Sequence, residues 1–158
     1  MTDLLLRSVL WLLLGGWIGA SSYFALVVAL AAFRVLPSAE LAGQLVAAVY
    51  APLQLYGVGA GLCLAALAWA LGRGRWLVVH PLVLSVLCFT SHFGITARLD
   101  ELREQAFGAV PRAAASAEFW KLHGASMGIH SAVLLGSVWL LMLHVRADLA
   151  LGEKREIS

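Results

Sequence analysis

The sequence predicts an all-α protein, a four-helix transmembrane bundle in up-down-up-down order. Of its 158 residues, 61% are hydrophobic and 13% are charged, whereas soluble domains are nearer to half apolar and a quarter charged. Four apolar stretches alternate with short turns, and each is long enough for a bilayer crossing of ~20 residues. We therefore expect one polytopic domain over residues 1–158, with spans at about 4–33, 46–71, 76–97 and 119–143.

The first two spans are separated by a clear stop signal. The first apolar stretch runs unbroken to Phe33, which is too long for the apolar region of a cleaved signal peptide. Pro37 disfavours helix at the residue before it, and Ser38 is a good N-cap for the second helix. Pro52 removes one backbone hydrogen bond inside the second helix, so we expect a kink there.

The third and fourth spans follow short connections. The turn Gly72-Arg73-Gly74-Arg75 makes the second and third helices antiparallel. A loop at 107–115 then leads to the fourth helix, for which Ser116 is the expected N-cap. The runs FRVLPSAE (33–40) and FGAVPRAAASAE (107–118) share several residues, which suggests two related hairpins.

Polar residues gather on one face of the fourth span. Between Leu122 and Leu143 there is no Asp, Glu, Lys or Arg, and at 100° per residue the histidines and serines form one stripe. Such a stripe should face other helices or a wet cavity rather than lipid. The expected polar interior, including residues from the second and third spans, consists of His123, Ser126, His130, Ser137, Ser85 and Gln54.

Pairs of glycines four residues apart recur along the chain. GxxxG steps let helix backbones approach closely in lipid, where packing holds helices together. The predicted helix-packing glycines are Gly15, Gly19, Gly57, Gly61, Gly124 and Gly128. Faces of this kind that are unused inside the bundle would suit a homo-oligomer or a membrane protein partner.

The histidines allow two cofactor hypotheses beside a structural role. His92 and His130 lie at similar depth on antiparallel helices and could be axial ligands of one b-type haem. Cys88, His92 and His130 could instead bind copper or zinc, with Met127 and Cys63 nearby. The third hypothesis is structural: these histidines form hydrogen bonds to groups on neighbouring helices. No cofactor is required by the pattern.

Other function classes find little support. The net charge of +2 does not suggest nucleic acid as a partner, and no nucleophile–base set or phosphate loop is visible, so we lean against an enzyme. The partner that the composition requires is the lipid bilayer. We expect a multi-pass protein of a bacterial inner membrane, with both termini cytoplasmic by a narrow excess of basic residues on that side.

Three runs resemble a known family. They are Gly15-Gly16-Trp17 in the first span, Leu-Pro-Ser-Ala-Glu-Leu-Ala-Gly at 36–43, and Phe-x-x-Leu-His-Gly-x-Ser at 119–126. Together they resemble the transmembrane protein 205-like family of small four-helix membrane proteins. The resemblance covers nearly the whole chain and implies this fold, with no settled reaction. The chain departs from the family pattern at Ala31, where a proline is common, and at His130, where an asparagine is common.

We therefore expect a non-enzymatic membrane protein that binds or helps to move a small solute or metal species, or that supports a membrane partner. The alternative is a b-type haem-binding redox protein.

Overall fold

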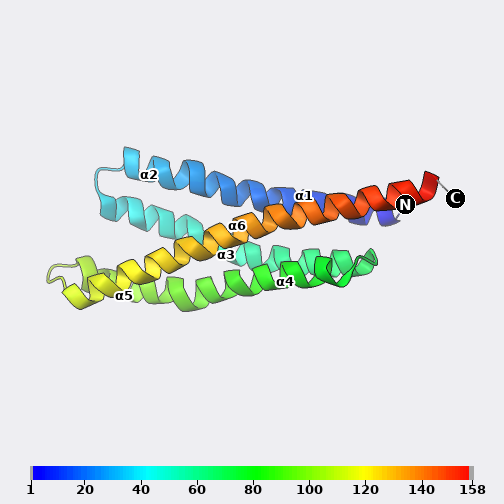
Figure 1. The fold of residues 1–158 in the computed structure, drawn as a ribbon. Helices are drawn as coiled ribbons and strands as arrows, with labels where there is room; N and C mark the ends of the chain where they lie inside the picture. Colours follow the sequence, from blue (N-terminus) through cyan, green and yellow to red (C-terminus); the bar gives the residue numbers. More distant parts are fainter. Residues whose placement is uncertain (1, 157–158) are drawn as a thin grey trace.

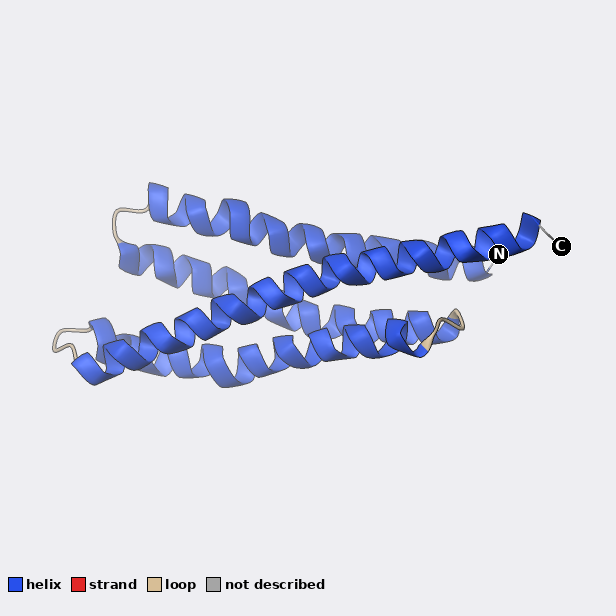
Figure 2. Ribbon diagram, in the orientation of Figure 1, coloured by secondary structure: helices blue, strands red, loops and turns tan. Residues whose placement is uncertain are grey.

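The protein consists of four long helical rods, shown in Figures 1 and 2. A computed structural model describes the backbone of residues 2–156 and the side chains of residues 3–150. The elements in chain order are α1 (Thr2–Tyr23), the π-helix η1 (Phe24–Val28), α2 (Ala29–Val35), α3 (Ala39–Ala70), α4 (Arg75–Thr90), the π-helix η2 (Ser91–Thr96), α5 (Ala97–Phe107) and α6 (Ala113–Glu156). The four-helix, all-α prediction is confirmed, and the described residues contain no strand.

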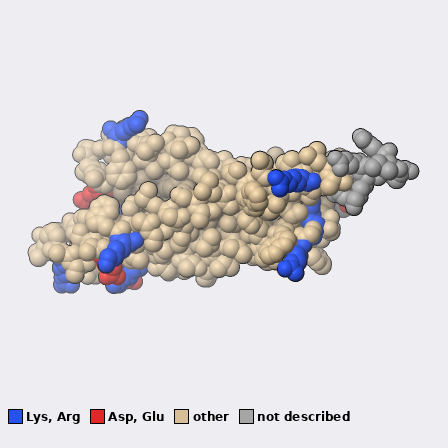
Figure 3. All heavy atoms as spheres, in the orientation of Figure 1, with Lys and Arg blue, Asp and Glu red and all other residues tan. Residues whose placement is uncertain are grey.

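The rods have the length and composition of membrane spans. Four helical stretches, Asp3–Val35, Ala39–Ala70, Arg75–Phe107 and Ala113–Ala150, are long and apolar enough to cross a bilayer. In Figure 3 the charged side chains gather at the two ends of the molecule, and a broad uncharged belt lies between them. The chain is thus an integral, multi-pass membrane protein.

The connections follow local backbone chemistry. Ser38 caps α3 as predicted, because its Oγ accepts a hydrogen bond from the Leu41 amide at 3.2 Å. Gly72 ends the second rod with φ +63°, a left-handed conformation that glycine adopts without steric cost. The prediction for Ser116 was wrong, because α6 begins three residues earlier at Ala113 and Ser116 lies inside its first turn.

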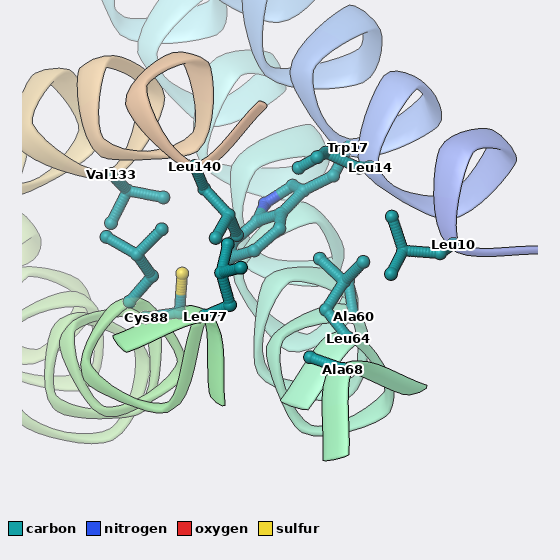
Figure 4. Packing of buried hydrophobic residues seen from close by; sticks show 11 residues of the cluster. Leu10, Leu14, Trp17, Ala60, Leu64, Ala68, Leu77, Cys88, Val133 and Leu140 are labelled. Carbon is teal, nitrogen blue, oxygen red and sulfur yellow. The ribbon is translucent and has the colours of Figure 1, made fainter. Parts of the chain in front are cut away.

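One half of the bundle, which we call the closed half, has a continuous apolar core. It lies toward the end where both termini and the Gly72 turn are found (Figure 1). All four rods contribute to this core, as Figure 4 shows: Leu10, Leu14, Trp17, Ala60, Leu64, Ala68, Leu77, Leu84, Cys88, Val133 and Leu140. Because every rod buries apolar side chains in this core, this half is the tightly packed part of the molecule.

A partly buried ion-pair cluster, in which the Arg73 side chain is the buried member, lies at the end of the closed half. Arg73 in the turn after α3 is only 2% exposed, and its Nη2 lies 2.6 Å from Oδ1 of Asp148 on α6. Arg7 of α1 reaches the same carboxylate oxygen at 3.3 Å. Nη1 of Arg73 also donates to the backbone carbonyl of His144 at 3.2 Å. The cluster therefore ties α1, the α3–α4 turn and α6 together.

The other half, which we call the open half, is built differently. The backbone of α2 lies against α3, and the backbone of α5 lies against α6, so this half of the bundle consists of two helix pairs (Figure 1). The α5–α6 pair has a small core of its own, made by Leu102, Ala106 and Ala115. The guanidinium of Arg103 reaches from α5 to the region of Gly43 on α3.

Three of the four rods are irregular where the two halves meet. The first and third rods carry the π-helices η1 and η2 there, and α3 carries Pro52. A π-helical turn inserts one residue into the helical repeat and is frequent at functional sites. On the third rod the buried positions Cys88, Ser91, Thr96 and Leu99 show this insertion as a five-residue step between Ser91 and Thr96.

Candidate functional site

Gln54 is the centre of a buried hydrogen-bond network at the junction of the two halves. Its Nε2 donates to Oγ of Ser91 at 2.6 Å, and its Oε1 accepts from Oγ1 of Thr96 at 3.0 Å. Nδ1 of His92 lies 3.3 Å from the same Oε1. Since Ser91, His92 and Thr96 all belong to η2, one side chain of α3 satisfies the polar groups that the π-helix turns inward.

His130 of α6 approaches the same region from the opposite side. Its ring packs edge-on against Phe24 of η1 and Tyr50 of α3, with centroid distances of 5.6 and 5.4 Å. Phe24 and Tyr50 in turn stack on each other at 5.2 Å. The backbone carbonyl of Ser21 lies within hydrogen-bonding reach of the imidazole. Nε2 of His130 is buried and has no hydrogen-bond partner among the described residues.

A small cavity separates these two groups of residues. It is lined by Trp17, Ser21, Tyr50, Leu53, Gln54, Cys88, Ser91, Ile129, His130 and Val133. The cavity volume is about 10 Å³, which is room for about one water molecule. None of the lining residues is Asp, Glu, Lys or Arg, so the cavity offers hydrogen-bonding groups without a formal charge.

The haem hypothesis is not supported by this arrangement. His92 turns its Nδ1 to Gln54, whereas His130 is enclosed by Phe24 and Tyr50, so the two rings do not face a common space. A cavity with room for one water is also far smaller than a porphyrin ring. The geometry therefore gives no site for a haem held between these helices.

The soft-metal hypothesis has the same difficulty. Cys88 and His130 line the cavity, but His92 does not. Met127 is 61% exposed and Cys63 is exposed, so neither reaches the interior. Among the residues that the structure describes, no three His, Cys, Asp or Glu side chains come together as a metal site.

The remaining residues of the expected polar interior lie in four different settings. Ser85 is buried and donates to the Val58 carbonyl of α3 at 2.9 Å. Ser137 is buried but donates within its own helix, to Val133 at 2.8 Å. Ser126 is 6% exposed on α6, one turn from His130. His123 stacks on Phe119 in the open half, with ring centroids 6.1 Å apart, so it belongs to a separate aromatic cluster.

Only one of the predicted glycine pairs lies at a close contact between helices. A Cβ on Gly57 would lie 2.7 Å from Sγ of Cys88, and a Cβ on Gly61 would lie 2.6 Å from the carbonyl of Pro81. These two glycines therefore permit the close approach of α3 and α4. A Cβ on Gly15, Gly19, Gly124 or Gly128 would meet nothing within 4 Å, so these four do not pack inside the bundle as expected from the pattern.

Sequence reasoning missed the parts of the site that depend on η1 and η2. Ser91 and Thr96 are five residues apart, and on a regular helix they would not share a face. The inserted π turn brings both to Gln54. Nothing in the sequence distinguishes Phe24, because an aromatic residue in an apolar span is usually part of the hydrophobic core. Tyr50 was recognisable only through its closeness to Pro52.

Comparison with known proteins places the chain in one family. A search of curated proteins and a search of solved structures each found no match. The profile of the family described as "Domain of unknown function (DUF4149)" matches residues 12–108, which contain Gln54, Ser91, His92 and Thr96 but not His130. Because this match spans more than half of the chain, the protein belongs to the DUF4149 family.

Proposed function

We propose that this protein binds a small neutral polar solute inside the membrane, in the cavity between Gln54 and His130, and that it does so without catalysing a reaction. The proposal includes a bacterial inner membrane with both termini cytoplasmic, and a relationship to the transmembrane protein 205-like family through the run at 119–126. Its scope is binding, with transport as the natural extension.

One observation carries the proposal: His130, whose buried Nε2 has no partner among the described residues, is one of the residues that line a cavity inside a membrane bundle. Ionisable residues within spans are expensive and usually mark functional sites. The cavity adds the amide of Gln54 and the hydroxyl of Ser91, and Gln54 keeps one N–H beyond its bond to Ser91. A solute that both donates and accepts hydrogen bonds would satisfy these groups together.

The absence of formal charge from the cavity lining favours a neutral solute. A bare ion would lose its hydration without an opposite charge to replace it, which is costly in a low-dielectric site. A neutral molecule with a donor and an acceptor loses far less. The position at the junction of the two halves also matters, because the closed half seals one side while the diverging helix pairs leave the other side free to move.

The test uses nitrogen NMR of the imidazoles in the full-length protein, with formamide as the probe. Formamide is larger than one water molecule, so its binding requires the residues that line the cavity to move apart. We expect the Nε2 signal of His130, assigned by its loss in His130→Phe, to shift as formamide is added. His80 is the internal control, because its Nε2 is already 3.0 Å from the Gly136 carbonyl and should not respond.

A Gln54→Leu variant should reduce the His130 response at least several-fold. Equal shifts at His130, His80 and His123, or none at His130, would contradict binding at this cavity. A response of His130 to Zn²⁺ and not to formamide would replace the neutral solute with a metal.

A further inference from the structure

A second space lies beside the cavity, on the lipid-facing side of the same junction. It is a groove of about 500 Å³ between the first rod and α3, within the ~300–1,000 Å³ usual for ligand pockets. Its lining is almost entirely apolar: Gly16, Ala20, Tyr23, Phe24, Val28, Val49, Pro52, Leu53 and Tyr56. The small side chains at Gly16 and Ala20 leave the room that the groove occupies.

The groove and the cavity are separated by a wall about one side chain thick. Leu53 lines both spaces. Phe24 lines the groove and contacts, on its other side, the rings of His130 and Tyr50 that line the cavity. A molecule lying in the groove would therefore have one end close to the hydrogen-bonding groups of the cavity.

We propose that the ligand is a neutral single-chain amphiphile, whose hydrocarbon chain lies in the groove and whose hydroxyl or amide head enters the cavity. This inference rests on the proposed function and names the class of its solute. Three features select the class. The groove is lined mainly by apolar side chains, the cavity offers donors and acceptors without charge, and the space inside is small enough to require a compact head.

Head entry requires movement of Phe24 and Leu53, and both lie at irregular backbone. Phe24 begins η1, and Leu53 follows Pro52 in α3. Helix irregularities leave backbone groups less constrained than a regular turn does. The wall between the two spaces is thus placed where the helices can adjust with least loss of regular hydrogen bonding.

The experiment uses a monoacylglycerol that carries a photoreactive diazirine on its acyl chain, added to the full-length protein in nanodiscs. Crosslinks mapped by mass spectrometry should fall on residues 16–28 and 49–56. Excess unlabelled monooleoylglycerol should compete, whereas oleate and oleylamine should compete at least several-fold less well because of their charged heads.

Two adjacent small residues give a matched pair of variants. Ala20→Leu fills the groove, and labelling should fall about tenfold. Gly19→Leu adds the same bulk on the neighbouring position, where a Cβ meets nothing within 4 Å, and labelling should be unchanged. Equal labelling of both variants, or equal competition by all three lipids, would overturn the proposal.

The formamide experiment separates the two proposals. Ala20→Leu leaves the cavity lining intact, so the His130 response to formamide should persist while labelling is lost. If formamide binds normally but His130→Phe leaves monoacylglycerol labelling and its head preference unchanged, the groove binds bulk lipid and the amphiphile proposal fails alone. If His130 does not respond to formamide, the proposed function fails as well.

Discussion

The two ends of the bundle hold their charges in opposite ways. In the closed half, Arg73 is 2% exposed and shares the Asp148 carboxylate with Arg7. In the open half, Arg98 pairs with Glu101 and Glu118, and all three side chains are about half exposed or more. The ion pairs that join α1, the turn and α6 are thus partly shielded from water, with the Arg73 side chain buried, while those of the open half are screened by water.

This contrast agrees with the packing of the two halves. The closed half has a core from all four rods, and the open half consists of two helix pairs. The candidate site lies at the boundary between the part with a core from all four rods and the part made of two helix pairs. The candidate site therefore lies where the tight packing of the bundle ends.

We expect the greatest loss of stability when Asp148, the acidic member of the ion-pair cluster in the closed half, is replaced. Asp148→Asn leaves Arg73 buried without its charge partner, and the free energy of unfolding should fall by about 3 kcal/mol. The measurement is unfolding in mixed detergent and SDS micelles followed by circular dichroism. A double variant, Arg73→Met with Asp148→Leu, should recover most of the loss. If Asp148→Asn has no effect, the two ends do not differ as described.

A smaller loss is expected at the boundary itself. Gln54→Leu removes the partner of Ser91, His92 and Thr96, and should lower the free energy of unfolding by about 1–2 kcal/mol. Gln44→Leu is the control, because Gln44 is an exposed residue of the same helix. Equal stability of the two variants would mean that the Gln54 network contributes nothing.

The third prediction has the opposite sign. His144 is fully buried beside Arg73, and neither of its ring nitrogens has a partner among the side chains that the structure describes. His144→Leu removes two unsatisfied polar atoms at similar volume and should raise the free energy of unfolding by about 1 kcal/mol. His80→Leu is the matched control and should destabilise, because it removes the contact to Gly136. Destabilisation by both changes would show that His144 has an unrecognised partner.

The smallest effect is expected in the open half. Glu118→Gln removes the exposed contact to Arg98 at 3.2 Å, and water already screens such pairs. We expect no measurable change in Tm at any salt concentration. A clear loss of stability that vanishes in high salt would instead assign the open half a structural ion pair, and the contrast between the two ends would disappear.

Much of the fold was predictable because the rules that decide it are local. Apolar length identifies a span, Pro37 and Ser38 mark the stop and the cap, and Gly72 marks the turn. Gln54, Ser126 and His130 could be assigned to the interior, because a polar side chain in a span avoids lipid. The same rule does not predict which polar residues contact one another. Ser137, for example, donates its hydrogen bond to a backbone carbonyl of its own helix, α6.

The geometry of the site could not be predicted, for two physical reasons. Face assignments assume 100° per residue, and the inserted residue in η1 and in η2 rotates everything that follows. The residues that follow His92 on the third rod, such as Thr96, therefore face differently from what a regular helix predicts. The second reason is sequence distance, because Arg73 and Asp148 are far apart in the chain and nothing local marks either as the other's partner.

The sequence alone determined how many times the chain crosses the membrane and where it turns, because hydropathy and backbone hydrogen bonding act within a few residues. Only the tertiary structure decided which side chains face one another, where the bundle is sealed and where a cavity remains. Those outcomes depend on the rotation of whole helices, and a single extra residue in a turn is enough to change them.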